Sequence, residues 1–362
     1  MNLDERIKLV SNVGEEVVTL PELRQLLEEK KNPIAYDGFE PSGMAHLAFG
    51  VFRALLLKDL IKAGVRFKIW LADWFAWINN KMDGDLEKIR QVGEYFIEVW
   101  KAAGVPTNKV EFLWASEAMD SVDYWSRVVK IAKNTTVARA TRALTIMGRR
   151  EGEMKEVAQY FYPMMQVADI FHLEADITQL GLDQRRANML AREVGPKLGW
   201  WKPVVISHHM LMNLEGAAEP EGYDEEKGFD IQISSKMSKS RPESSVYVHD
   251  TQDEIRTKIM AAYCPPKEAE GNPLLDYAKH IVFRGFDHIT VERKQKFGGD
   301  IDFTSYDELE KAYVAGDLHP LDLKNTMVTY LDKMIDPIRA HFEQKTSAKE
   351  MLELVRSYQI TR

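Results

Sequence analysis

Two lysines in a loop are the strongest chemical signal in this chain. Lys236 and Lys239 lie in the pentapeptide Lys-Met-Ser-Lys-Ser, within residues 213–245, where glycine, proline and serine replace any regular apolar spacing. Such a loop can bring two positive charges and several hydrogen-bond donors over a polyphosphate. Loops of lysine and serine are common, so the charge pattern alone leaves a phosphate site and an ordinary solvated loop both open.

A second signal is a histidine beside a glycine turn. Gly43 and His46 follow a predicted strand at residues 34–39, and His46 opens a predicted helix at 46–63. Backbone N–H groups at a helix N-terminus attract phosphate, helped by the helix dipole. An imidazole there can donate to phosphate oxygens as charge moves during displacement. A histidine that merely caps the helix is the alternative.

Polar residues at helical spacing form the third signal. Tyr162, Gln166 and Asp169 stand at i, i+4 and i+7, so a helix would place a phenol, an amide and a carboxylate on one face. Their neighbours are apolar, which is unusual for a stripe that faces solvent, although a solvent-facing stripe remains the alternative. Asp183 and Gln184 then open a predicted helix directly after a strand, at the edge where α/β folds bind nucleotides.

These residues need a scaffold, and the first two-thirds of the chain alternates short apolar runs with longer amphipathic ones. This alternation predicts an α/β fold with a Rossmann-like, doubly wound parallel sheet. A mostly helical insertion at about residues 116–175 interrupts the alternation. We predict strands at residues 34–39, 67–72, 110–114, 176–180 and 204–207, and helices at 46–63, 85–103 and 183–198.

Helical patterns dominate after the lysine loop. Thr251 with Glu254, and Ser305 with Glu308, fit the capping box that begins a helix. We therefore divide the chain into a Rossmann-like domain at residues 1–228, a linker with the lysine loop at 229–249, and a mainly α-helical domain at 250–362.

Composition sets limits on the cellular setting. The 362 residues carry a formal net charge of −8, which opposes nucleic-acid binding, yet residues 124–150 hold seven basic residues and no acidic one. That run fits either a solvated face or a phosphate-binding surface. Cys264 is the single cysteine, and no apolar run reaches the ~20 residues of a membrane span. Because the start also lacks a signal-peptide pattern, we expect a cytoplasmic protein without membrane contact.

Together these segments resemble the tyrosyl-tRNA synthetases of the archaeal and eukaryotic branch, which are class I aminoacyl-tRNA synthetases. The resemblance covers nearly the whole chain. Residues 236–240 match one class I signature letter for letter, and residues 41–50 resemble the other, His-Ile-Gly-His, with Ala48 and Phe49 as departures typical of this branch. Residues 34–43, 297–300 and 319–325 resemble further segments of the family.

The resemblance implies a tyrosine–tRNA ligase that activates L-tyrosine with ATP to tyrosyl-adenylate and pyrophosphate, then transfers tyrosine to the 3′ end of tRNA(Tyr). It implies Mg²⁺ on the substrate phosphates, no permanent prosthetic group, no metal held by the chain, and a homodimer. The last domain would bind the anticodon. The implied residues are Tyr36, Tyr162, Gln166, Asp169 and Gln184 for tyrosine; Gly38, Gly43, His46, Gly181, Asp183, Met237 and Lys239 for ATP; His46, Lys236 and Lys239 for catalysis; and Arg185, Phe297 and Asp322 for tRNA.

Two other classes compete with this interpretation. A tryptophan-specific relative would share the fold and both signatures, but an indole has only one donor to satisfy Tyr36 and Asp169. An RNA-binding or scaffold protein with an inactive site is the other alternative, although Lys236, Lys239 and His46 are all present. The adjacent His208 and His209 could suggest a metal site, but neighbours in a strand point to opposite faces.

Overall fold

The computed structural model describes residues 1–149, 153–237 and 241–358, and a six-stranded sheet forms its centre. The strand order is β1-β6-β5-β2-β3-β4, with five strands parallel and β1 antiparallel at the edge. The doubly wound parallel sheet is thus confirmed, and the antiparallel edge strand is an addition to it. The strands are β1 (Glu16–Val18), β2 (Ile34–Phe39), β3 (Arg66–Leu71), β4 (Val110–Trp114), β5 (Ile177–Thr178) and β6 (Val204–Ser207).

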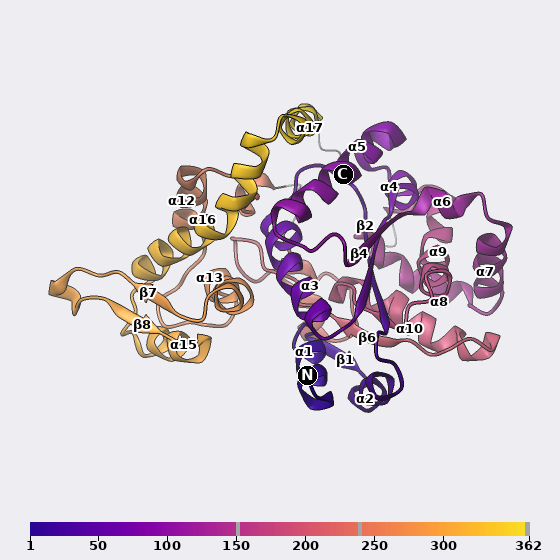
Figure 1. Cartoon of the computed structure of the whole chain (residues 1–362), viewed down its shortest axis with the longest axis horizontal. Helices are drawn as coiled ribbons and strands as arrows, with labels where there is room; N and C mark the ends of the chain where they lie inside the picture. Colours follow the sequence, from indigo (N-terminus) through magenta and orange to yellow (C-terminus); the bar gives the residue numbers. More distant parts are fainter. Residues whose placement is uncertain (150–152, 238–240, 359–362) are drawn as a thin grey trace.

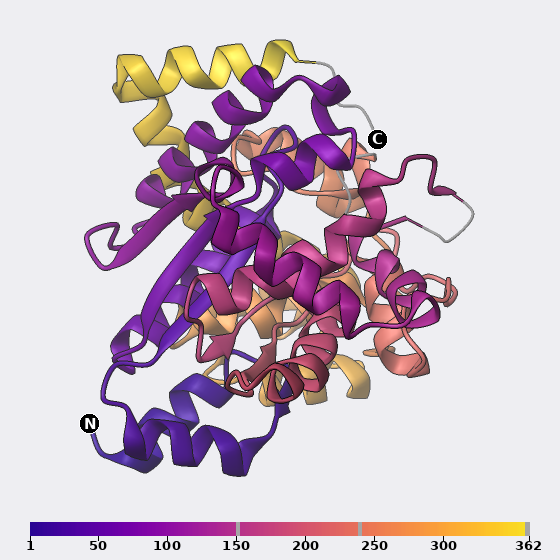
Figure 2. The same cartoon turned by 90° about the vertical axis from the view of Figure 1, so that its right-hand side faces the viewer.

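Helices cover both faces of this sheet, as Figures 1 and 2 show. Each face has its own apolar core, one that includes Leu27, Leu56 and Val99 and one that includes Phe171 and Leu190. The helices up to β6 are α1 (Leu3–Ser11), α2 (Leu20–Glu29), α3 (Arg53–Lys62), α4 (Asp73–Ile78), α5 (Leu86–Ala102), α6 (Ala115–Met119), α7 (Val122–Lys133), α8 (Val137–Ala143), α9 (Ala158–His172) and α10 (Arg185–Val194).

The helical insertion predicted at about 116–175 is present as α6 to α9. Its amphipathic helix α7 turns Tyr124, Val128 and Ile131 inward, and α9 is buried over nearly its whole length. α9 lies between α7 and α10 and forms part of the core on one face of the sheet. This position brings the α9 polar residues close to the ends of β2 and β3.

The predicted helix at 46–63 begins differently from expectation. Residues Ala48–Phe52 form a π-helical turn, and the regular helix α3 starts only at Arg53. Gly50 permits this entry, because a Cβ there would meet Val248 at 2.5 Å. The segment after β2 therefore approaches the chain near Val248 closely, and that contact fixes where His46 lies.

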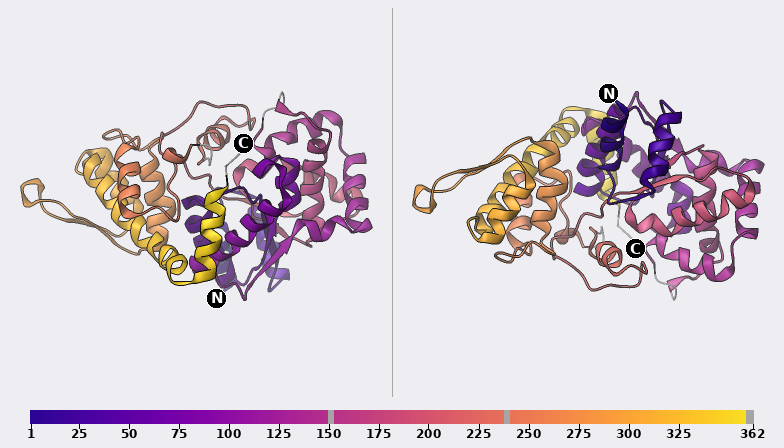
Figure 3. Two further views of the ribbon diagram at one scale, coloured as in Figure 1. Left: turned by 90° about the horizontal axis from the view of Figure 1, so that it is seen from above. Right: turned by 90° about the horizontal axis from the view of Figure 1, so that it is seen from below.

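The C-terminal part is mainly helical, as predicted, and carries a small hairpin. Its core is continuous with one core of the sheet, through residues such as Phe342 and Leu331. The hairpin of β7 (Ile289–Val291) and β8 (Ile301–Phe303) stands out at the end farthest from the insertion (Figures 1 and 3). The helices after β6 are α11 (Lys227–Ser235), which precedes the lysine loop, and then α12 (Gln252–Ala261), α13 (Pro273–Tyr277), α14 (Phe283–Gly285), α15 (Tyr306–Ala315), α16 (Pro320–Gln344) and α17 (Thr346–Ser357).

The last two helices return to the first half of the chain. α17 packs against α5 (Figure 1), and Glu98 of α5 accepts from His341 at 2.7 Å and Lys345 at 2.6 Å. The domain boundaries at residues 228 and 250 stay predictions. Within the described ranges, no helix combines the length and the apolar character that crossing a membrane requires.

Candidate active site

A cavity of about 1380 Å³ lies among the carboxyl ends of the central strands, the helix α9 and the lysine loop. It collects most of the residues that the sequence analysis selected, although they come from segments far apart in the chain. Those that line it are Tyr36, Gly38, His46, Tyr162, Gln166, Asp169, Asp183, Gln184, Lys236 and Met237. Lys239 lies outside the described residues.

Two of the predicted glycines support the wall without lining the cavity. Gly43 has a φ of +89°, a left-handed conformation that favours glycine. Gly181 has no room for a side chain, because a Cβ there would meet Asp183 Oδ1 at 2.6 Å. Both positions therefore require glycine for the shape of the site.

One end of the cavity, which we call the phenol end, is buried and contains the phenol of Tyr36 and the carboxyl group of Asp169. Tyr36 and Asp169 are each 1% exposed, and within the described chain the Tyr36 hydroxyl has no hydrogen-bond partner. Asp169 accepts from the Tyr124 hydroxyl at 2.7 Å. Burial raises the pKa of the Asp169 carboxyl well above its usual value, although the Tyr124 bond opposes that rise. This end can therefore pair with a hydroxyl group in an otherwise apolar place.

Sequence reasoning missed Tyr124. It lies on the buried face of α7, which alone suggests only a core residue, and its partner Asp169 is 45 positions away. The signal that could have found it is a phenol on an apolar helix face beside a second helix with a buried carboxylate.

The polar stripe of α9 faces the interior, which decides against the solvent-facing alternative. Tyr162 and Gln166 are 5% and 6% exposed. The Tyr162 hydroxyl donates to Glu40 at 2.6 Å, whereas the buried Gln166 Nε2 is without a partner among the residues described. Gln184 donates to the Ile146 carbonyl at 3.0 Å. Glu40, which sequence reasoning also missed, lines the same wall.

The other end of the cavity combines a carboxylate, a lysine and a histidine. Lys236 Nζ lies 2.5 Å from Asp183 Oδ2. Burial lowers the pKa of Lys236, but the charge of Asp183 outweighs it, so the net pKa rises and the ammonium stays protonated. Backbone pairing with residues 211–212 fixes the start of the lysine loop in this wall.

His46 both caps the start of the helical segment that follows it and lines the cavity. Its Nδ1 accepts from the Phe49 N–H at 3.3 Å, and its backbone pairs with Tyr247. The capping alternative from the sequence is therefore correct as far as it goes, yet the same imidazole is in the cavity wall. Because Nδ1 accepts a hydrogen bond, the proton of a neutral ring lies on Nε2.

The residues predicted for tRNA are not among those that line the cavity. Arg185 forms an ion pair with Glu16 at 2.9 Å and is 3.9 Å from Asp224. Phe297 is 58% exposed in the loop of the β7–β8 hairpin, where Lys296 lies 4.8 Å from its ring centroid. Asp322 lies in the first turn of α16.

The basic run at 124–150 is not one surface. Arg139 forms an ion pair with Glu193 at 3.0 Å, whereas Arg149 donates to Asn79 Oδ1 at 2.6 Å and to its carbonyl at 2.7 Å. Arg150 lies outside the described residues. Arg149 thus belongs to the cavity wall, where it is held by its hydrogen bonds to Asn79.

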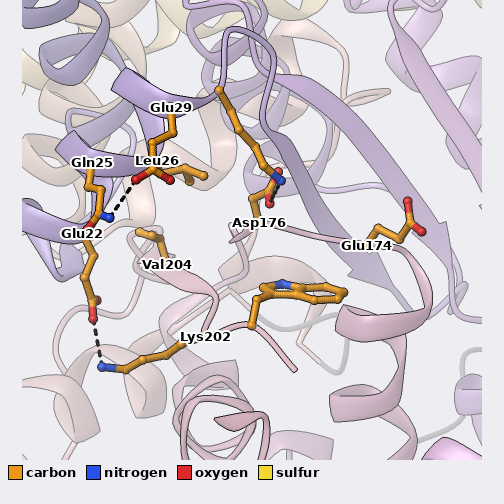
Figure 4. Close-up of a pocket in the computed structure, with 10 residues that line it drawn as sticks. Glu22, Gln25, Leu26, Glu29, Glu174, Asp176, Lys202 and Val204 are labelled. Carbon is orange, nitrogen blue, oxygen red and sulfur yellow. Dashed lines mark hydrogen bonds and ion pairs between the residues drawn. The ribbon is translucent and has the colours of Figure 1, made fainter. Parts of the chain in front are cut away.

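A second hollow, of about 540 Å³, lies beside α2 and holds none of the predicted residues (Figure 4). Its charged groups are mostly paired with one another. Glu22 bonds to Lys202 at 2.8 Å, and Asp176 bonds to Lys30 at 2.6 Å. Such satisfied pairs stabilise the sheet edge and leave little free charge for a ligand.

His209 forms a half-buried link between the sheet and the C-terminal helices. Its Nε2 is 2.7 Å from Asp276, its Nδ1 is 3.5 Å from Glu15, and its ring stacks on His280 at 3.9 Å. Burial lowers the pKa of His209, but Asp276 and Glu15 outweigh it and raise it to about 9. The link was not predicted, because its members lie far apart in sequence.

Comparison with known proteins agrees with this geometry. Residues 28–219 and 230–336 match the family model described as tRNA synthetases class I (W and Y). The fold and the cavity therefore define a class I tRNA synthetase.

Proteins similar to this chain indicate which member of this class it resembles. The chain is 46% identical to tyrosine–tRNA ligase 1, cytoplasmic, of Arabidopsis thaliana, over 99% of this chain and 90% of that protein. The tyrosyl-tRNA synthetase of Pyrococcus horikoshii, solved with L-tyrosine, superposes with a TM-score of 0.90 at 42% identity, over 99% and 100% of the two chains. That of Leishmania major, solved with tyrosinol, gives 0.89 at 41%, but this chain spans 53% of it. This chain belongs to the tyrosine–tRNA ligase family.

Proposed function

We propose that the protein activates L-tyrosine with ATP, releasing pyrophosphate, and transfers the tyrosyl group from the adenylate to the 3′ end of tRNA(Tyr). The observation that carries the proposal is the buried Tyr36 hydroxyl beside Asp169, for which the described residues supply no partner of its own. A buried polar group in that state is costly, about 1–3 kcal/mol. A substrate phenol would satisfy it.

This arrangement explains selection of tyrosine against phenylalanine. The phenol of tyrosine would bond to Tyr36 and Asp169, whereas a phenylalanine ring would leave the Tyr36 hydroxyl unsatisfied in a dry pocket. At the opposite end of the amino acid, Tyr162, Gln166 and Gln184 would hold the ammonium and backbone. The Gln166 Nε2 has no partner among the residues that the structure describes, which supports this role, because its two N–H donors need an acceptor such as a carboxylate.

ATP would lie across the strand ends. Gly38, Gly43 and Gly181 would allow its backbone contacts, Asp183 would accept from the ribose, and Met237 would contact the nucleotide. Mg²⁺ would accompany the phosphates and bind largely through their oxygens. No permanent prosthetic group is proposed.

The first reaction step is an in-line displacement. An oxygen of the tyrosine carboxylate attacks the α-phosphorus, the bond to the bridging oxygen breaks, and pyrophosphate leaves with the electron pair. His46, Lys236 and Lys239 would stabilise the negative charge on the phosphate oxygens. No covalent bond to the protein is required, so positioning and charge supply the catalysis.

The Lys236–Asp183 ion pair fits this sequence of events. In the structure the two charges neutralise each other at 2.5 Å. A ribose hydroxyl that donates to Asp183 would replace the ammonium, and Lys236 could then turn to the phosphates. One exchange would thus prepare both residues for their proposed roles.

The tRNA would contact both ends of the molecule. Arg185 would approach the first base pair of the acceptor stem, while Phe297 would stack on the first anticodon base and Asp322 would bond to it. The exposed ring of Phe297, on a hairpin that stands away from the sheet, supports that role.

We also propose a homodimer that works in the cytoplasm. The insertion exposes large apolar side chains at Val122 (84%), Val129 (62%), Val137 (80%) and Val157 (77%). Several such residues on neighbouring helices favour a protein contact. The compartment is proposed from the Arabidopsis relative, whose name includes the word cytoplasmic.

Amino-acid-dependent exchange of labelled pyrophosphate into ATP tests the proposal. The protein is incubated with ATP and each amino acid in turn. Exchange with tyrosine alone is the expected result. Exchange with tryptophan alone would assign the protein to the tryptophan-specific group, and no exchange at all would leave only an RNA-binding or scaffold role.

A further inference from the structure

Glu40 stands at the centre of a half-buried hydrogen-bond network in the cavity wall. It follows β2 directly, and its side chain is 18% exposed. It accepts from the Tyr162 hydroxyl at 2.6 Å and from Asn79 Nδ2 at 3.0 and 3.1 Å. Lys81 Nζ lies 3.9 Å away, at the outer limit of an ion pair. The carboxylate therefore has neutral donors close by and a cation only at a distance.

The proposed ammonium site needs a negative charge that its own residues do not supply. Tyr162, Gln166 and Gln184 are neutral, and an ammonium taken out of water without a counter-charge is strongly unfavourable. The other carboxylates of the wall are placed or paired differently. Asp169 lies at the phenol end and bonds to Tyr124, Asp183 pairs with Lys236, and Glu215 pairs with Arg241. Glu153 and Glu221 have interactions of their own.

We propose that Glu40 is the counter-ion of the substrate ammonium and acts through the Tyr162 hydroxyl as well as by its charge. The inference rests on the proposed function, since it takes tyrosine as the ligand and Tyr162 as a contact of its amino group. Glu40 is thereby a positioning residue, and it makes the site specific for substrates with a free amine.

The direction of the hydrogen bonds supports this role. A phenol has one proton to donate, and Tyr162 gives it to Glu40. Burial first, and then the Glu40 charge, raise the pKa of Tyr162 well above its usual value, so the proton stays on the phenol. The lone pairs of its oxygen then remain for an ammonium donor. Chains of this kind polarise one another, which strengthens each bond in a site of low dielectric.

The test uses the variant Glu40→Gln in the full-length protein and two tyrosine fragments as competitive inhibitors of pyrophosphate exchange. Tyramine has the ammonium but no carboxylate, and 3-(4-hydroxyphenyl)propionate has the carboxylate but no ammonium. Gln keeps an oxygen that can accept from Tyr162 and Asn79, so the change removes charge with little change of shape. Glu215→Gln is the matched control, because it removes a carboxylate from the same wall that pairs with Arg241.

We expect the inhibition constant of tyramine to rise about tenfold or more in Glu40→Gln, in line with loss of a charged partner. That of the propionate should stay the same or fall, because a repelling charge is gone. Glu215→Gln should change neither. Equal weakening of both fragments in Glu40→Gln, or unchanged tyramine binding, would overturn the proposal.

A second variant tests the same proposal independently, in case Glu40→Gln fails to fold. Tyr162→Phe keeps Glu40 but removes the hydroxyl between it and the ligand, and it should weaken tyramine more than the propionate. Failure of the unsubstituted protein to exchange pyrophosphate with tyrosine would refute the proposed function instead. The two failures are therefore distinct.

Discussion

Replacing Tyr36 with phenylalanine should make the free protein more stable and the enzyme less selective. The ring of Tyr36 is 1% exposed and packs in the core, and its hydroxyl lacks a partner within the described part of the chain. Phenylalanine keeps the ring and removes that hydroxyl. The variant therefore isolates one oxygen atom at the phenol end of the cavity.

The size of both effects follows from hydrogen bonds, which the Tyr36 oxygen loses to water on folding and would regain from the substrate on binding. An unpaired buried hydroxyl costs about 1–3 kcal/mol, so the free energy of unfolding should rise by about 1 kcal/mol or more in Tyr36→Phe. In the complex, the missing hydrogen bond to the substrate phenol should cost a similar amount. Because 1.4 kcal/mol is a factor of ten, kcat/KM for tyrosine should fall about tenfold.

The activity of the variant with phenylalanine as substrate should not fall as its activity with tyrosine does. Its ring leaves the Tyr36 hydroxyl unsatisfied in the original protein but not in the variant, so kcat/KM for phenylalanine should stay constant or rise. Urea denaturation without ligand gives the stability, and pyrophosphate exchange with each amino acid gives the selectivity. A variant that is clearly less stable, with the ratio of tyrosine to phenylalanine activity unchanged, would refute the reasoning.

Three further predictions concern other parts of the molecule. A histidine whose pKa rises from its ordinary value of 6.5 to about 9 in the folded protein adds stability below pH 6.5 that is lost as pH rises through 9. His209→Asn should therefore lower the free energy of unfolding by about 3 kcal/mol at pH 7 but little at pH 9.5. Urea denaturation at both pH values measures this, and equal loss at both would contradict the ion-pair assignment. Asp322→Ala should reduce tRNA aminoacylation about tenfold while sparing pyrophosphate exchange; equal loss in the two assays would mean that the residue acts on activation. Val137→Glu should shift the protein from dimer to monomer in sedimentation equilibrium, and an unchanged mass would place the subunit contact elsewhere.

The sheet could be predicted from sequence because its signal is local. β2, β4 and β6 lie at the predicted residues, and β3 differs by one position, since each is a short apolar run between turn signals. β1 was missed because three half-buried residues between two helices carry no readable period. The π-helical entry at Ala48–Phe52 was missed for another reason, since close contact with Val248 comes from a distant segment.

The residues of the candidate site also fall into those that a local motif predicts and those that depend on a distant partner. Residues inside recognisable motifs, such as His46 and Lys236, could be selected one by one. Tyr124 and Glu40 could not, because each is significant only through a partner 45 or 122 positions away. A helix face or a strand end indicates where a side chain points but not which side chain it meets.

A crystal structure of the protein with L-tyrosine tests the central claim most directly. We expect the phenol oxygen of the ligand within hydrogen-bond distance of Tyr36 Oη and Asp169, and the ammonium beside Tyr162 and Gln166. A ligand bound in the reverse direction, or outside the cavity, would contradict it.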